Sequence, residues 1–524
     1  MATIEVLSQE VLHNIFHLGT QDDSGFALKI SHVCSLWRGI AHSSSDLWAY
    51  VAVKNNIDNR FSDTATFRPN TSPSRKPQPL RKFARYLKLS KARPLHVDVT
   101  LSMPPIDARN DETNIITDTT YSLRIQSIAC LLVPHFDRIC TLKVSCDSYS
   151  SVYTFFEALD SETAQMCHQL RDCDIEWTGP LCAVENFPRT LSRNHEISML
   201  DKSGELDTFP NLRRLRLCGV SVDWSNFSPS HLKELSISNI HEDFRPPFQI
   251  LRSILIANQD TLQTLSLLGV GRPTDAEILT FDLPNVHTLE IGYEEPEHLH
   301  AIVSSMSLPL LKNLTVRNMK GRRGGMIEEL SFPGITDPYF LRTNELFEKF
   351  TAKWDFSKLE HIKLVDIEFM DDNIRLPNPV EYPDLILRSQ STSDGWRYDR
   401  RWKDISAGDL PLKFWDSCRN VKDLVLERPD LATLFSLVFP SPSECVDGEA
   451  TFDLPLPKLE HLGLFGMRTW TLEEFLQRRQ KVIAQWSKTT PISLALTTDS
   501  CSPILAELCG GLAQNYSIWY AKAV

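Results

Sequence analysis

Apolar residues near the start of the chain recur every three or four positions, which is the spacing of an amphipathic helix. The first such stretch covers residues 6–18. Ser8 is placed to cap it, and Glu10 lies in the first turn, where a carboxylate suits the helix dipole. A polar break over residues 19–25 ends this stretch, and a second one covers residues 26–41. The pattern predicts a short helical unit.

A different apolar phrase, LxxLxL, recurs from about residue 94 onward and predicts a short strand at each copy. Copies begin at Ile139, Leu212, Leu232, Leu262, Val286, Leu311, Leu359, Val421 and Leu459, and Leu95 opens an earlier strand. Near the middle of the array, successive copies are 20, 30, 24 and 25 residues apart. Later steps of 48, 62 and 38 residues indicate insertions or degenerate repeats.

The repeated phrase predicts how the units stack. One strand and one single-faced helix cannot cover their own apolar side, whereas stacked neighbours bury it continuously. We therefore expect an α/β solenoid with parallel strands inside and helices outside. The array resembles leucine-rich repeats, whose period is about 20–29 residues, and the resemblance implies a binding scaffold. A compact α/β enzyme also alternates strands and helices, but it would not repeat this phrase so often.

The helical unit carries a motif at fixed spacing. It reads Leu7-Ser8-x-Glu10-Val11-Leu12-x-x-Ile15-Phe16, then Ser31-x-Val33-Cys34-x-x-Trp37-Arg38-x-Ile40-Ala41, then Leu47-Trp48. This motif resembles the F-box, with Ser8 where that family usually has proline. About 45 residues rarely bury enough surface to be stable alone. We therefore expect the unit to bury its surplus apolar side chains against a partner or the rest of the chain.

The F-box resemblance implies docking to a Skp-type adaptor and, through it, to a cullin. The chain would then be a substrate-recognition subunit of an SCF-type ubiquitin ligase. The implied adaptor-binding residues are Leu7, Ser8, Val11, Leu12, Ile15, Phe16, Val33, Cys34, Trp37, Leu47 and Trp48. Some of them must instead hold the small helices together, and spacing alone does not sort the two groups. Two alternatives stay open: an F-box protein acting outside a ligase, and a repeat scaffold whose N-terminus is only a cap.

These patterns predict three regions: an F-box at 1–54, a linker with an amphipathic helix at 55–93, and a solenoid at 94–524. Insertions are expected near 318–358 and 370–415. The linker is basic, with eight Lys or Arg and no acid from Arg75 to Arg93. A solvated outer face of a packed helix explains this run, and a nuclear-import or nucleic-acid segment is the alternative.

Target binding is expected on the sheet face, where the neighbours of the strand leucines project. The candidates there are Arg214, Arg216, Glu290, Arg317 and Lys363. The segment 370–415 adds Trp396, Arg400 and Trp402, of the residue types that dominate protein interfaces. The charges on these positions are mixed, so they do not identify a ligand class.

Composition says more about the cellular compartment of the protein than about its biochemical function. The net charge of −12 argues against non-specific binding to nucleic acid or anionic membranes. No secretory signal and no long uncharged apolar run is visible, and the scattered cysteines suit a reducing compartment, so we expect a cytoplasmic or nuclear protein. No phosphate loop, HExxH or GxSxG motif is present. We therefore expect a non-catalytic protein that needs no cofactor or metal.

Overall fold

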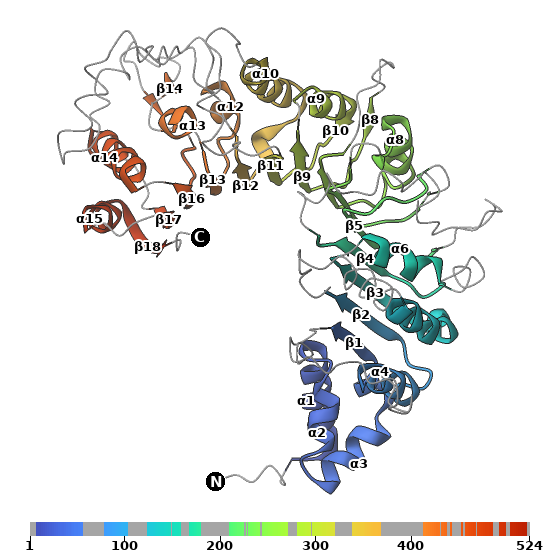
Figure 1. The fold of residues 1–524 in the computed structure, drawn as a ribbon. Helices are drawn as coiled ribbons and strands as arrows, with labels where there is room; N and C mark the ends of the chain where they lie inside the picture. Colours follow the sequence, from blue (N-terminus) through green and yellow to red (C-terminus); the bar gives the residue numbers. More distant parts are fainter. Residues whose placement is uncertain are drawn as a thin grey trace, which may run out of the picture. The chain divides into compact units, whose positions relative to one another are not determined.

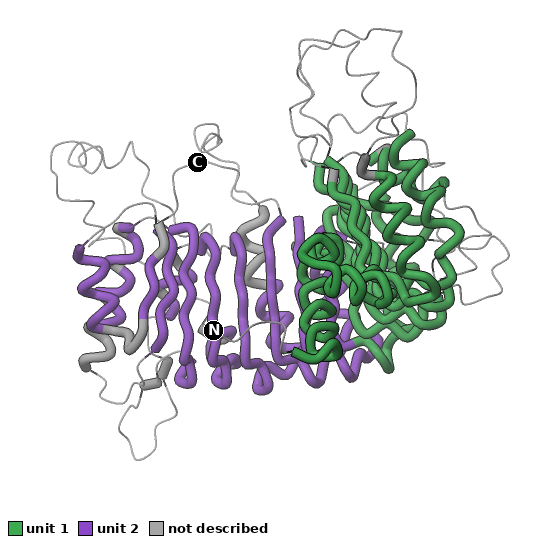
Figure 2. The backbone as a smooth tube through the Cα atoms, turned by 90° about the horizontal axis from the view of Figure 1, so that it is seen from below, with its two compact units in different colours: residues 1–262 green, residues 263–524 purple. Residues whose placement is uncertain are grey.

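The computed structural model divides the chain into two compact units, unit 1 at residues 1–262 and unit 2 at residues 263–524 (Figure 2). It describes residues 7–55, 78–102, 123–147, 149–158, 167–179, 209–224, 227, 229–241, 244–270, 280–294, 296–319, 338–367, 412–429, 431–437, 441–442, 452–453, 456–467, 469–485, 492–498 and 503–520. Both units combine helices with parallel strands (Figure 1). No helix among these residues is long and apolar enough to cross a membrane.

Unit 1 opens with short helices, namely α1 (Gln9–Asp22), α2 (Phe26–Ser31), α3 (Ser35–Ser43) and the 3-10 turn η2 (Ser45–Trp48). Helix α1 runs past its predicted end at residue 18, with Gly19 inside it. Phe26 packs so closely there that a Cβ on Gly19 would lie 2.4 Å from the ring. The second predicted helix is two helices, because the extended Cys34 starts α3, its Sγ accepting the Trp37 N–H at 3.4 Å.

A parallel sheet follows in unit 1, and its strands lie side by side in chain order. They are β1 (Tyr50–Asn55), β2 (Leu95–Leu101), β3 (Ile139–Cys146), β4 (Asp172–Trp177), β5 (Arg214–Cys218) and β6 (Glu234–Ser238). Helices α4 (Gln78–Leu89), α6 (Tyr149–Glu157) and α8 (Phe248–Ala257) lie on one face of this sheet (Figure 1).

Unit 2 repeats the arrangement. Its parallel strands are β7 (Thr264–Leu268), β9 (Thr288–Tyr293), β11 (Asn313–Asn318), β12 (His361–Val365), β13 (Asp423–Glu427), β16 (His461–Met467), β17 (Ile492–Thr498) and β18 (Ala513–Tyr520). Helices α9 (Pro296–Ser305), α10 (Pro338–Lys353), α12 (Leu412–Ser417), α13 (Leu431–Ser436), α14 (Thr469–Gln485) and α15 (Pro503–Leu512) lie on one side of them (Figure 1). Short two-residue strands, β8 (Phe281–Asp282) with β10 (Met306–Ser307) and β14 (Ser441–Pro442) with β15 (Phe452–Asp453), pair separately.

The LxxLxL phrases form the strands, and their leucines form the core. In β5 the buried Leu215 and Leu217 alternate with the exposed Arg214 and Arg216. Within each unit most neighbouring strands pair in unshifted register, so leucines stack across the sheet and polar residues form lateral rows on the opposite face. The predicted α/β class with parallel strands is confirmed.

Several strands leave the sheet through a residue in the left-handed region, and these residues are Gly219, Asn239, Gly269, Asp366 and Arg428. Gly466 has the same conformation inside β16, at a register shift. The turn extends the ladder by one bond: the N–H of Asp366 donates to the carbonyl of Glu427 at 2.9 Å, and that of Arg428 to Phe465 at 2.8 Å. Glycine, asparagine and aspartate tolerate this conformation best. Arg428 is held there by a bidentate ion pair with Asp366.

Of the insertion predicted at 318–358, the structure describes residues 318–319 and 338–358. Residues 338–353 form α10, which follows β11 and precedes β12, where a repeat would place its helix. Its side chains Leu346, Phe347 and Phe350 are buried. Of the second predicted insertion, residues 370–411 lie outside the described residues.

Candidate functional site

The N-terminal helices have a small aromatic core. Leu12 and Phe16 of α1 are buried, and the Phe16 ring lies 4.8 Å from the half-exposed Trp37 of α3. Trp48 is also buried, and its indole Nε1 donates to the Ala41 carbonyl at 2.7 Å. These contacts hold α1, α3 and η2 together.

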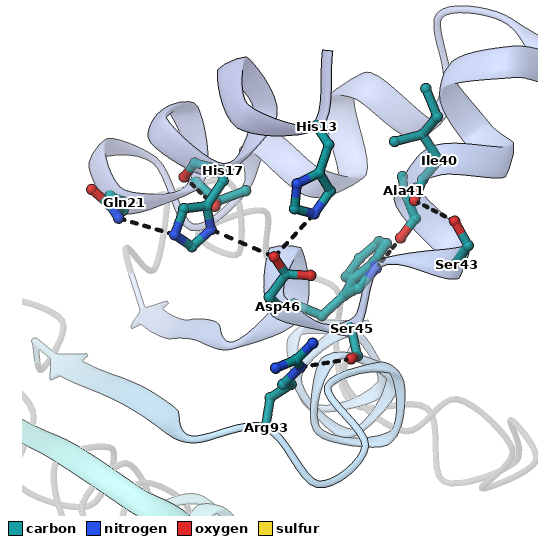
Figure 3. A network of polar contacts seen from close by, with 11 residues as sticks. His13, His17, Gln21, Ile40, Ala41, Ser43, Ser45, Asp46 and Arg93 are labelled. Atoms are coloured by element: carbon teal, nitrogen blue, oxygen red, sulfur yellow. Dashed lines mark hydrogen bonds and ion pairs between the residues drawn. The ribbon is translucent and has the colours of Figure 1, made fainter. Parts of the chain in front are cut away.

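A polar network ties the outer side of α1 to η2 (Figure 3). Asp46 lies between two stacked histidines: its carboxylate is 3.0 Å from His13 Nε2 and 3.9 Å from His17 Nδ1. On its other side His17 Nε2 lies 3.2 Å from the Gln21 amide. Arg93, in the turn before β2, donates to Ser45 at 3.3 Å. The network fixes how α1 lies relative to the start of the sheet.

Large aliphatic side chains remain uncovered on this unit. Val11, Ile15 and Leu18 follow each other at helical spacing along α1, and Leu7 lies just before its N-cap. Val33 lies just before α3, and Leu36 lies in its first turn. All are exposed, reaching 62% at Leu18 and 60% at Val33. We call these six residues the exposed apolar face. Single exposed leucines are ordinary, but such a group on one small unit is typical of a docking surface.

The structure sorts the predicted adaptor-binding residues into two groups by exposure. Leu7, Ser8, Val11, Ile15, Val33 and Cys34 are exposed, and Trp37 is half-exposed. Leu12, Phe16, Leu47 and Trp48 are buried, so they support the unit from within. Ser8 caps α1 as predicted, accepting the Val11 N–H at 3.3 Å. Leu18 and Leu36 were missed, although Leu18 continues the stripe of Ile15 at helical spacing.

The helical unit is connected to the sheet of unit 1 both through the chain and through packing contacts. Strand β1 follows η2 directly and pairs with β2, and α4 packs on β1. Buried Arg138 fastens the end of α4: its guanidinium donates to the carbonyls of Leu87 at 3.1 Å and Arg93 at 2.8 Å, and to the Ser90 hydroxyl at 3.0 Å. Burial lowers the pKa of Arg138 from its ordinary value.

The predicted target-binding residues of unit 1 lie on the sheet face opposite the helices, and carboxylates flank them. Arg214 forms a bidentate pair with Asp172 at 2.6 and 2.8 Å, which lowers the pKa of that carboxyl. Arg216 lies 3.9 Å from both Asp174 and Glu176. Burial raises the pKa of Asp174, against the pull of Arg216.

Unit 2 shows the same pairing. Arg317 lies 3.6 Å from Glu290, and Lys363 forms an ion pair with Glu427 at 2.9 Å. Such pairs cross from strand to strand and leave a mixed-charge surface. Trp396, Arg400 and Trp402 lie outside the described residues. Trp415, at the end of the same segment, is fully buried, and its Nε1 donates to the Ser436 hydroxyl at 2.7 Å.

The described residues offer binding surfaces more readily than reactive groups. Burial raises the pKa of Cys146 and Cys418 to about 12, so these thiols stay protonated and unreactive at neutral pH. No group of three or more His, Cys, Asp or Glu side chains in the described ranges is arranged to hold a metal ion. The exposed apolar face is the candidate functional site, because large aliphatic side chains remain uncovered there.

No family model matches the chain, and no curated protein matches it significantly.

Proposed function

We propose that this protein is the substrate-recognition subunit of an SCF-type cullin-RING ubiquitin ligase. The helical unit docks onto a Skp-type adaptor, and the parallel-strand array binds the target protein. The observation that carries the proposal is the exposed apolar face on a unit whose sequence resembles the F-box.

The exposed apolar face supports docking because its residues keep between 39% and 62% of their surface exposed in unit 1. Val11 and Ile15 are 43% and 46% exposed, while Leu12 and Phe16, one position away, are buried. The helix thus has an inner and an outer apolar stripe. A partner that covers the outer stripe would stabilise the complex by about 25 cal/mol per Å² of apolar surface removed from water.

The sheet faces are weaker support for target binding than the exposed apolar face is for adaptor docking. Their arginines, lysines and carboxylates already pair with each other, so a target must be complementary in shape and charge to compete for them. The protein would act by proximity, holding the target near a ubiquitin-charged enzyme and transferring nothing itself.

Affinity purification followed by mass spectrometry tests this function. The tagged full-length chain is compared with V11D/I15D and with a matched control, L123D/L310D, which places the same two charges at exposed leucines that do not belong to the helical unit. We expect the wild type and the control to retain a Skp-type adaptor and a cullin, and V11D/I15D to lose both. Retention of the adaptor without a cullin would instead indicate an F-box protein acting outside a ligase.

A further inference from the structure

A row of cations lines the outer side of α4 and the turn after it. The residues are Arg81, Lys82, Arg85, Lys88, Lys91 and Arg93, all exposed, and no acid interrupts them. We call this row the basic ridge. It runs against the net charge of −12 that the chain carries as a whole.

The backbone beneath the basic ridge is firmly held. Phe83, Tyr86 and Leu87 turn inward and are buried, with the Tyr86 ring 5.0 Å from that of Trp48. At the other end, Arg138 binds both sides of the turn that carries Lys91. The cations therefore project from a preorganised support, which lowers the entropy lost when a ligand binds.

Three cations of the basic ridge form no ion pair with a described carboxylate of the protein. Among the described residues, no carboxylate lies within 4.0 Å of Arg85, Lys88 or Lys91. The carboxylate of Asp23 is influenced by Lys82 of the ridge, but it already binds Lys29 at 2.6 Å. Positive charge on α4 is thus available to an outside partner.

Lys91 occupies a position that its side chain does not suit. Its φ is +49°, in the left-handed region where glycine or asparagine would be favoured. Helix capping does not account for a lysine here, because the Leu87 carbonyl at the end of α4 is already bound by Arg138. The lysine does extend the row of cations beyond the helix.

We propose that the basic ridge binds an extended acidic segment of a partner protein. Arg85 and Lys88 lie one turn apart on α4, and Lys91 follows in the turn after the helix. An extended peptide places same-face side chains about 7 Å apart, so alternate Asp or Glu residues can pair with these three cations. Single-stranded nucleic acid would need exposed aromatic rings to stack on, whereas Phe83 and Tyr86 are buried. Binding to a membrane would need apolar residues that point outward from α4, whereas Phe83 and Leu87 point inward and are buried.

The inference goes beyond adaptor docking and does not depend on it. Fluorescence anisotropy tests it on the purified full-length chain, with a labelled ten-residue peptide of alternating Glu and Ser as the probe. The ridge variant R85E/K88E/K91E is compared with K349E/K353E/R419E, which reverses three exposed cations of unit 2. Each titration is run at about 50 and about 200 mM salt, across the range where exposed charges become screened.

We expect the wild type and the unit 2 control to bind the peptide with similar affinity, weakened by salt. The ridge variant should bind at least about tenfold more weakly, as expected from losing three exposed ion pairs. Equal affinity in all three proteins would overturn the proposal. So would tighter binding of a DNA duplex or an anionic vesicle than of the peptide, if the ridge variant abolished it, because the ridge would then serve another polyanion.

Lys91→Gly gives an internal check that does not rely on charge reversal. Relief of the left-handed strain should raise the thermal midpoint, while loss of one cation should weaken peptide binding about twofold. A variant that gains stability and keeps full affinity would show that Lys91 takes no part in peptide binding, which would count against the proposal.

Discussion

Arg138 shows how a single buried side chain can join two regions that look separate in sequence. Its hydrogen bonds run to two carbonyls and one hydroxyl at the end of α4, so the cation satisfies backbone acceptors that the helix leaves open. Arginine suits this task because one planar group donates in several directions at once.

Replacing Arg138 with methionine should lower the free energy of unfolding by about 3 kcal/mol, because buried acceptors lose their donors. Arg171→Met, at an exposed position, should change it by less than about 0.5 kcal/mol. Chemical denaturation followed by tryptophan fluorescence measures both. Similar values for the two variants would contradict the role given to Arg138.

Two partly buried histidines predict a loss of stability in mild acid. Burial lowers the pKa of His96 and of His135 below the ordinary 6.5. The unfolded chain therefore takes up protons first as the pH falls, and stability declines from about pH 6.5 through the lower folded pKa values. Below those values the contribution is fully lost.

Thermal unfolding at pH 7.5 and pH 5.5 checks this sign. His96, stacked 4.5 Å from Tyr50, accounts for part of the effect, so His96→Asn should lose less stability on acidification than the wild type. His32→Asn, at an exposed position, should behave like the wild type. An equal loss of thermal stability in all three proteins would show that His96 does not contribute to the effect.

At the scale of elements, the left-handed turn after the strands is a recurrent device. Gly466 adopts the same left-handed conformation inside β16, with a φ of +68°, and a Cβ there would lie 2.7 Å from Cγ of Arg428. Gly466→Ala should therefore destabilise unit 2 by about 1–2 kcal/mol.

Gly39→Ala is the matched substitution with the opposite sign. Gly39 lies in α3, where an added Cβ would meet no atom within 4 Å, and alanine favours a helix interior over glycine by about 1 kcal/mol. Thermal melts of both variants give the comparison. Destabilisation by G39A, or none by G466A, would show that backbone conformation does not control stability at these positions.

The elements differ in how far the sequence predicts them. Strands at LxxLxL phrases were predicted well, because alternating burial is a local signal that every copy repeats. The end of α1 was misplaced, because Gly19 normally ends a helix and only the packing of Phe26 explains its place inside one. Helix α10 lies within residues 318–358, where the long step between LxxLxL copies indicates an insertion or a degenerate repeat.

The candidate site was predicted in part for a similar reason. Spacing identified the motif, but it could not separate Val11 from Leu12, since one position decides which stripe of α1 faces the core. The linker's positive charge was visible in sequence. That Arg138, 45 residues beyond Arg93, fixes its end depends on a long-range contact that no local pattern reveals.

At the scale of the whole molecule, two surfaces of unit 1 are proposed to bind partners, the exposed apolar face and the basic ridge. Within unit 1, the exposed apolar face, the basic ridge and the first strands share one support, since β1 belongs to the sheet and α4 packs on it. A partner held on the helical unit is therefore held at a fixed place relative to the strands of that unit.

Titration calorimetry of the purified chain with a purified Skp-type adaptor tests adaptor docking most directly. We expect saturable binding with a negative heat-capacity change, as burial of apolar surface requires. V11D/I15D should weaken the affinity about a hundredfold, or about 2.7 kcal/mol, and L123D/L310D should leave it unchanged. No binding by the wild type, or equal binding by V11D/I15D, would contradict the proposed function.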